Sequence, residues 1–319
     1  MPEERIVVQV KSLVSETVTQ VKFTAVIPTY NRAHLIERAI ESVLNQSVPP
    51  EQVVVVDDGS ADDTRAVVSQ FKDQVTYIFQ ENAGSAVARH TGILAAESDW
   101  IALLDSDDVW LPHHLERMAD VIYKTNGQAN FYFADTIQPD AGSFWRARHF
   151  KIDGAYELKS DATDWVLPRL QPMLLQASVF NRQAYLASGG FLSPLRFRDD
   201  THLYLKLGLN GAACAVAGYG TKMTADDDPD NRLTLTHNKK KVQGHQMQVI
   251  MFQDLLQTMS VSPQVRDVLK NRLASAHFSL SKYAFQERRL PEMVKQFILS
   301  VRVDYRVFVN RITGRFWGK

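Results

Sequence analysis

Short apolar runs alternate with amphipathic stretches between Phe23 and about Asn126. Phe23–Ile27 and Val53–Val56 are rich in β-formers and end at residues typical of turns. Between them, apolar side chains recur at helical spacing, namely Ile36, Ala39, Ile40, Val43 and Leu44. This order of strand, helix and strand predicts an α/β fold, with a mostly parallel sheet that helices cover on both faces.

The alternation continues with strands predicted at Val75–Phe79 and Trp100–Leu104 and a helix at Ser85–Ala96. Farther along, the pattern is less regular, and the predicted strands are Phe131–Ala134, Ala177–Phe180 and Ala212–Ala217. Leu alternates with other residues over His202–Leu209, which by itself suggests a strand, although Leu favours helices. From Gln243 the chain is predicted to be helical.

Composition excludes several classes of protein. Lys plus Arg and Asp plus Glu both number 36, so no bulk charge favours nucleic acid. We find no run of about 18 apolar residues and no apolar block near the N-terminus, so neither a membrane span nor a secretory signal is expected. The single cysteine, Cys214, fits a reducing compartment. We therefore expect a cytoplasmic protein.

The strongest chemical feature is a group of carboxylates directly after the run Trp100–Leu104. Asp105, Asp107 and Asp108 are hard oxygen ligands of the kind that suit Mg²⁺ or Mn²⁺, and such an ion would also bridge a diphosphate. An Asp-rich turn that caps the next helix is the alternative interpretation, because Asp-x-Asp alone is common.

Polar residues also follow the other predicted strands, and ligands bind beyond the carboxyl ends of such strands. Asp57 or Asp58 can accept a hydrogen bond from a uracil N–H or a ribose hydroxyl, although Asp-Asp-Gly-Ser also fits a turn and helix cap. Tyr30 offers a ring for base stacking, unless Pro28–Arg32 is only a capping loop. Arg89 follows a glycine turn and a helix start, which suits phosphate, although a surface arginine is the alternative.

These motifs resemble, in order and spacing, family two of the inverting glycosyltransferases, which have the GT-A fold. The matching segments are Pro28-Thr29-Tyr30-Asn31, Asp57-Asp58-Gly59-Ser60, Asn82-x-Gly84 with Arg89, and Asp105-Ser106-Asp107-Asp108. The resemblance implies that Tyr30 and Asp58, with Pro28, hold the donor's base and that Asp105 contacts ribose or metal. It also implies that Asp107 is the main protein ligand of Mn²⁺ or Mg²⁺.

The second half of the chain is similar to the same family at Gly189-Gly190-Phe191 and at Phe197-Arg198-Asp199-Asp200. The family's catalytic base is the second acid of the latter segment, which carries over to Asp200. Asp199 stands where Glu is usual, so it stays open which of the two is the base, and charge at a helix start is the alternative to both. The resemblance also predicts a helix at His202–Leu209. We treat His237 as a candidate additional metal ligand, the alternative being a structural or solvated histidine.

The resemblance implies metal-dependent transfer of a sugar, most commonly from a UDP-sugar, to a hydroxyl of a glycan or glycolipid during polysaccharide or lipopolysaccharide synthesis. Residues 22–125 would bind the nucleotide sugar and 126–241 the acceptor, with an N-terminal extension at 1–21 and a helical region at 242–319. A non-catalytic sugar-nucleotide module would not need the acids at 199–200. A nucleotidyltransferase would be expected to show a glycine-rich basic loop after the first strand, which Pro28–Arg32 is not.

Residues 287–319 combine an apolar stripe with an excess of basic side chains. The stripe recurs at helical spacing and consists of Val294, Phe297, Ile298, Val301, Tyr305, Phe308 and Ile312. Such a helix can lie in a membrane interface, and Phe316 and Trp317 would support it there. Packing on the catalytic domain or on a second subunit is the alternative. Peripheral contact with the inner membrane face is a hypothesis at this stage.

Overall fold

A computed structural model describes residues 21–139, 141–195, 197–224 and 241–310 of the chain. Its centre is a sheet whose strands, in chain order, are β1 (Phe23–Thr29), β2 (Gln52–Asp57), β3 (Thr76–Phe79), β4 (Trp100–Leu103), β5 (Asp108–Trp110), β6 (Phe131–Gln138), β7 (Gly142–Ser143), β8 (Tyr156–Lys159), β9 (Ser178–Asn181) and β10 (Ala213–Met223).

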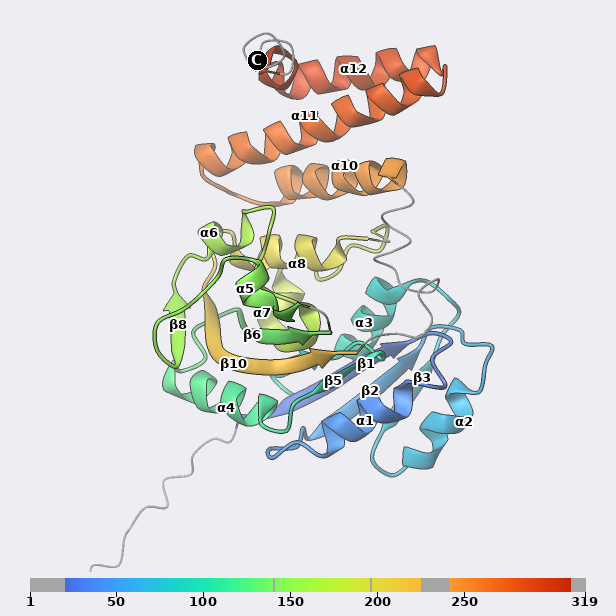
Figure 1. The fold of residues 1–319 in the computed structure, drawn as a ribbon, viewed down its shortest axis with the longest axis vertical. Helices are drawn as coiled ribbons and strands as arrows, with labels where there is room; N and C mark the ends of the chain where they lie inside the picture. Colours follow the sequence, from blue (N-terminus) through green and yellow to red (C-terminus); the bar gives the residue numbers. More distant parts are fainter. Residues whose placement is uncertain (1–20, 140, 196, 225–240, 311–319) are drawn as a thin grey trace, which may run out of the picture.

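The strand order is β3-β2-β1-β4-β9-β6-β10-β5, with β7 beside β6 and β8 beside β10 (Figure 1). The first four strands of this order are parallel, and β6 is parallel to β10. In contrast, β9 runs antiparallel to both β4 and β6, and β5 runs antiparallel to β10. The predicted α/β class with a mostly parallel sheet is confirmed.

Both faces of the sheet are covered, as the unbroken apolar runs require. Every residue of β1 is buried. Along this strand, Val26 packs in one hydrophobic cluster while Ala25 and Ile27 pack in the other. Successive side chains of a strand point to opposite faces, so the two clusters are the two layers between sheet and helices.

The helices that cover the sheet lie on both faces (Figure 1). Buried side chains of α1 and α4 belong to the cluster on one face, and those of α3 and α8 belong to the other. The α-helices of this part are α1 (Ile36–Leu44), α2 (Thr64–Val68), α3 (Ser85–Leu94), α4 (His114–Lys124), α5 (Phe144–Ala147), α6 (Thr163–Val166), α7 (Arg182–Ala187) and α8 (Asp199–Gly208), and short 3₁₀ turns lie at Ser69–Phe71 and Leu175–Ala177.

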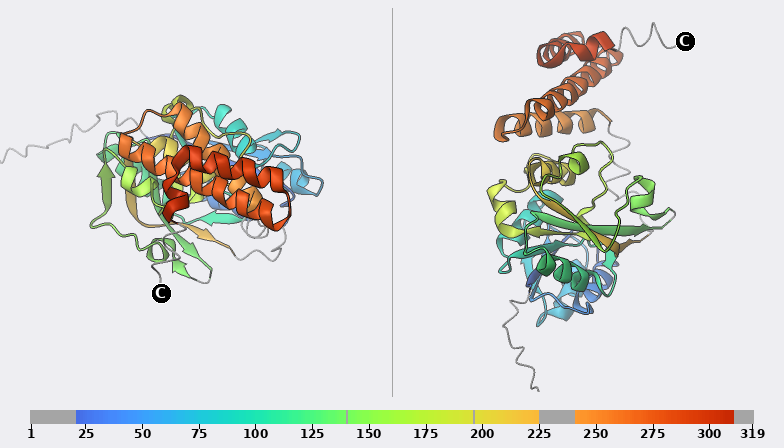
Figure 2. Two further views of the ribbon diagram at one scale, coloured as in Figure 1. Left: turned by 90° about the horizontal axis from the view of Figure 1, so that it is seen from above. Right: turned by 90° about the vertical axis from the view of Figure 1, so that its left-hand side faces the viewer.

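Three further helices form layers stacked on the α8 side of the sheet (Figures 1 and 2). They are α10 (Lys241–Thr258), α11 (Pro263–Gln286) and α12 (Leu290–Asp304), and they confirm the predicted helical C-terminal region. His202 of α8 is fully buried, and its Nε2 lies 2.7 Å from Oδ2 of Asp254 on α10. This contact attaches α8 to the first of these layers. No helix among the described ranges is long and apolar enough to cross a bilayer.

The structure settles one conflict in the sequence. Residues 202–208 are part of α8, as the family resemblance implies and contrary to their alternating pattern. His202, Leu203, Tyr204, Leu205 and Leu207 are all buried, because this helix lies between the sheet and α10. A helix that is covered on several sides shows no single apolar stripe, so its period cannot be read from hydrophobicity.

Candidate active site

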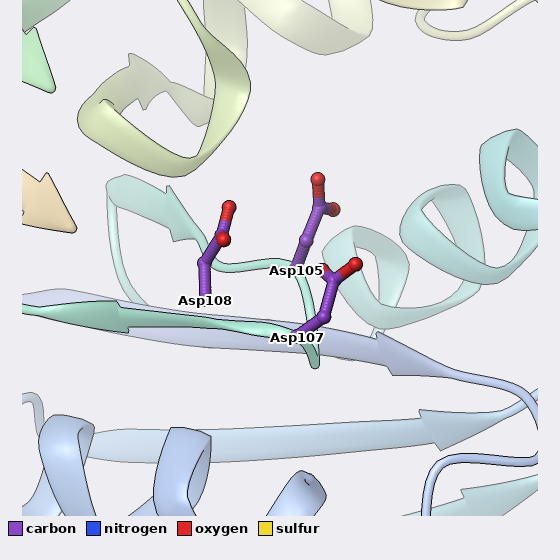
Figure 3. Close-up of side chains that lie close together, drawn as sticks. All are labelled: Asp105, Asp107 and Asp108. Carbon is purple, nitrogen blue, oxygen red and sulfur yellow. The ribbon is translucent and has the colours of Figure 1, made fainter. Parts of the chain in front are cut away.

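Three carboxylates lie together where β4 ends and β5 begins. The ligand oxygens of Asp105, Asp107 and Asp108 all lie within 4.8 Å of one another, and the side chains point to the same side of the loop (Figure 3). Asp108 is buried and the other two are half-buried. Carboxylates held this close repel one another unless a cation or donor groups compensate them, and three oxygen ligands suit a hard divalent ion.

The loop that carries these carboxylates is fixed by β10. Asp108 is the register partner of Met223 in the antiparallel pair of β5 and β10. The next residue, Thr224, donates its backbone N–H to Oδ1 of Asp108 at 3.3 Å and its hydroxyl to the backbone carbonyl of Asp107. The cluster is therefore held by a strand more than 100 residues later in the chain.

Arg89 joins the carboxylate cluster to the start of α8. Its side chain on α3 is buried, and its Nη2 donates to Oδ1 of Asp105 at 2.5 Å while its Nη1 donates to Oδ2 of Asp199 at 2.8 Å. Burial alone would lower the pKa of Arg89, but Asp105 and Asp199 raise it above its ordinary value, so the guanidinium stays charged. Both terminal nitrogens thus bind carboxylates, so the predicted contact with phosphate would have to compete with them.

Close packing of α3 on β1 sets the position of Arg89. Gly92 lies one turn farther along α3, and a Cβ atom there would come 2.3 Å from Cγ1 of Val26. Only glycine allows this approach, because any side chain would push the helix away from the strand. The small residues Ala86 and Ala88, just before Arg89 on the same helix, are buried as well.

The two acids at the start of α8 have different surroundings. Asp199 is buried and bound to Arg89, while Asp200 is half-buried and its Oδ1 accepts from the N–H of Thr201 at 2.6 Å. Burial raises the pKa of Asp199 to about 6; Arg89 opposes this shift and the neighbouring charge of Asp200 adds to it. Arg89 occupies one oxygen of Asp199, so this carboxylate is less free than that of Asp200 to contact a substrate hydroxyl.

Four of the residues predicted to bind the nucleotide, besides Arg89 and Asp105, lie at or near the ends of β1 and β2 and differ in their exposure to solvent. Tyr30 is 48% exposed and follows β1, whereas Pro28 is buried within that strand. Asp57 is buried, with Oδ1 accepting from the N–H of Ser60 at 2.8 Å and Oδ2 from the hydroxyl of Tyr77 at 2.6 Å. Both oxygens of Asp57 therefore already accept hydrogen bonds within the protein, the first of them in the expected turn, and its contact with the nucleotide stays a prediction.

Asp58 is equally buried and organises the loop after β3. Its oxygens accept from Nε2 of Gln80 at 2.7 Å and from the backbone N–H groups of Ala83 and Gly84 at 2.9 and 2.8 Å. The same carboxylate that was predicted to contact the base therefore shapes the loop that leads into α3. The candidate ligand His237 lies outside the described residues.

Sequence reasoning missed the ion-pair bridge and the contacts of Thr224. The motifs placed Arg89 and Asp105 near the same sheet edge, which was the available signal. Asp199 is 110 residues beyond Arg89, and no spacing rule connects two residues whose contact depends on how α8 docks.

The chain is similar in sequence to a family model and to proteins of polysaccharide synthesis. The family model for Glycosyl transferase family 2 matches residues 24–186, just over half of the chain. The succinoglycan biosynthesis protein ExoW of Rhizobium meliloti is 32% identical over 181 residues, which cover 53% of this chain and 55% of that protein. The Escherichia coli protein WfgD, a UDP-Glc:alpha-D-GlcNAc-diphosphoundecaprenol beta-1,3-glucosyltransferase, is 39% identical over 103 residues, or 32% of this chain and 41% of its own length. The chain thus spans about half or less of the length of these relatives.

A solved structure shares the fold over most of the chain. The complex of S. aureus TarS 1-349 with UDP-GlcNAc superimposes with a TM-score of 0.61 at 18% identity, covering 89% of this chain and 83% of that one. The likeness extends past the segment that the family model matches and includes part of the C-terminal helical region.

We predict that Arg89→Met lowers the free energy of unfolding by about 3 kcal/mol, because it leaves two largely buried carboxylates without their cation. Arg89→Lys keeps the charge but cannot form both bonds, so we expect an intermediate loss. Urea unfolding followed by circular dichroism measures both effects. The matched control is Arg65→Met on the exposed side of α2. Equal stability of the Arg89→Met and Arg65→Met variants would show that the bridge contributes nothing.

Proposed function

This chain belongs to glycosyl transferase family 2, and we propose that it moves a sugar from a nucleotide diphosphate donor to an acceptor hydroxyl with inversion at the anomeric carbon. The observation that supports this most is the convergence of the Asp105–Asp108 cluster and the acid pair of α8 on one buried arginine. A module that only binds sugar nucleotides has no need of the acid pair, Asp199 and Asp200.

The donor would lie across the carboxyl ends of β1, β2 and β4, where loops of parallel strands converge. The exposed ring of Tyr30 supplies a stacking face for the base, and the loop held by Asp58 borders the same edge. A UDP-sugar is our first candidate, because the name of the relative WfgD specifies UDP-Glc.

The carboxylate cluster fits a divalent cation, Mg²⁺ or Mn²⁺, because its three ligands are hard oxygens that already lie close together. Asp107 would be the main ligand, with Asp105 and Asp108 beside it. When bound, such an ion neutralises negative charge on a departing diphosphate. Arg89 keeps Asp105 in place and reduces the repulsion within the cluster.

We assign the role of general base to Asp200. It would accept the proton of the acceptor hydroxyl while that oxygen attacks the anomeric carbon from the face opposite the diphosphate. Asp199 acts as a positioning residue, since its carboxylate is buried against Arg89 and fixes the first turn of α8. Holding donor and acceptor in line supplies the rest of the acceleration.

The acceptor in this proposal is a growing glycan, free or lipid-linked. One relative is a succinoglycan biosynthesis protein, and the name of another specifies a sugar on a diphosphoundecaprenol carrier. Both kinds of acceptor, the free glycan and the lipid-linked one, offer a sugar hydroxyl to the base.

We predict that Asp107→Ala lowers the Mn²⁺-supported affinity for UDP at least about tenfold, because it removes the carboxylate proposed as the main ligand of the ion. Isothermal titration of UDP with and without Mn²⁺ measures this, over a panel that includes GDP and dTDP. Asp120→Ala is the matched control, since that exposed carboxylate lies on α4 and forms an ion pair with Lys124. Unchanged affinity in the Asp107 variant would remove the metal assignment.

We predict that Asp200→Asn lowers turnover by about 10²- to 10⁴-fold and leaves donor affinity nearly unchanged, because a base acts mainly in the transition state. Asp199→Asn should instead lower the free energy of unfolding, since it removes the negative charge that pairs with the buried guanidinium of Arg89. Release of UDP in the presence of acceptor and thermal unfolding together separate the two effects. The reverse pattern, with Asp199→Asn inactive but stable, would make Asp199 the base.

A further inference from the structure

The side of α12 that faces the rest of the protein is both polar and apolar, and Val303 on it packs against the main hydrophobic cluster. Ser300 and Asp304 are buried on α12, together with Val307 just beyond it. The hydroxyl of Ser300 donates to the carbonyl of Ala274 on α11 at 2.8 Å, and Nδ2 of Asn271 donates to Oδ2 of Asp304 at 3.1 Å. Hydrogen bonds and apolar contacts together therefore attach α12 to α11.

The opposite side of α12 is apolar and exposed. Leu290, Val294 and Ile298 follow one another at intervals of four residues, so they form one stripe along the helix, and their exposed fractions are 56%, 46% and 43%. Tyr305 and Val309, just beyond the helix, are 64% and 43% exposed. We call these five residues the outer stripe. Helices of globular proteins turn such a stripe inward, so its outward position indicates a contact surface.

Basic side chains accompany the outer stripe. Arg302 lies one helical turn after Ile298 and Lys295 lies three residues before it, and both are exposed. Arg288 and Arg289, also exposed, stand where the chain enters α12. Within 287–302 the acidic residues are Glu287, which pairs with Arg289, and Glu292, which is 3.9 Å from Lys295. Cations therefore outnumber anions along this side.

The position of α12 leaves the outer stripe accessible to a large flat surface. The sheet, α8, α10, α11 and α12 follow one another as layers, and α12 is the layer farthest from the sheet in both views (Figures 1 and 2). A planar partner can approach α12 without touching the catalytic domain. Of the stripe predicted from the sequence, Val294, Ile298 and Tyr305 are exposed. Its other described members, Phe297, Val301 and Phe308, are half-buried. Ile312, Phe316 and Trp317 lie outside the described residues.

We propose that the outer stripe docks the enzyme on the surface of an anionic lipid bilayer. An apolar stripe bordered by cations matches the boundary between acyl chains and anionic headgroups, where Tyr305 also fits as an amphipathic ring. A symmetric contact with a second copy would bring the same basic residues of both copies together, whereas an anionic surface attracts them. The proposal does not rest on the transfer chemistry.

Co-sedimentation of the full chain with vesicles tests this proposal in the absence of donor, so the result is independent of the transferase assignment. We expect binding to vesicles of phosphatidylcholine with phosphatidylglycerol at low salt, weaker binding at high salt, and little binding to phosphatidylcholine alone. Val294→Glu with Ile298→Glu should lower the partition coefficient at least about tenfold, because it places two anions in the contact. The matched control is Leu94→Glu with Tyr123→Glu, at sites 53% and 59% exposed on the catalytic domain, and it should bind like the unmodified chain.

A second variant keeps the test decisive if the first one fails to fold. Lys295→Gln with Arg302→Gln leaves the apolar stripe intact and should lower binding to anionic vesicles roughly tenfold or more. Absence of binding by the unmodified chain at low salt, or equal binding by the variants and the control, would overturn the proposal. A dimer in light scattering that Val294→Glu with Ile298→Glu converts to a monomer would also overturn it, by assigning the stripe to a second copy.

Discussion

The bridge from Arg89 to Asp105 and Asp199 is the contact on which the candidate site depends. Five acidic residues, Asp105, Asp107, Asp108, Asp199 and Asp200, gather around this region. A charge withdrawn from water is costly unless a partner compensates it, and Arg89 compensates two of these carboxylates at once. The same two bonds fix the distance between the cluster after β4 and the first turn of α8. The proposed donor site and the proposed base, which come from distant parts of the chain, are thereby held as one unit.

Packing on both sides keeps this bridge in position. On one side, Gly92 lets α3 approach β1 closely, which places Arg89 behind the strand ends. On the other side, His202 attaches α8 to Asp254 of α10, so the helix that carries the acid pair is held between the sheet and the C-terminal layers. The C-terminal helices therefore differ in what they contact. α10 holds α8, which carries the proposed base, while the proposed membrane contact lies on α12.

The sequence predicted those parts of the fold that depend on local periodicity. The strands from Phe23 to Leu104 could be predicted because each is a short apolar run that ends in turn residues, and the helices between them because each buries one face. The strand β5 and its pairing with β10 could not, since three residues carry no period and their partner lies over 100 positions away. The same limit applies to the site. The Asp105–Asp108 group was recognisable because it is contiguous, whereas the partner of Arg89 depends on the docking of α8. The oxygens of Asp57 could serve a turn or a ligand equally well in the sequence. The structure shows that one accepts from Ser60 in the turn and the other from Tyr77.

In the proposed function, Arg89 positions carboxylates without binding the donor, and a divalent ion at Asp107 would neutralise the diphosphate. A crystal structure of the full chain with Mn²⁺ and UDP tests this most directly, since the anomalous signal locates the ion. We expect an Mn²⁺ ion bound to Asp107 next to the diphosphate, with Arg89 still bound to both Asp105 and Asp199. An ion elsewhere, or Arg89 released from Asp199 and bound to the diphosphate, would contradict it.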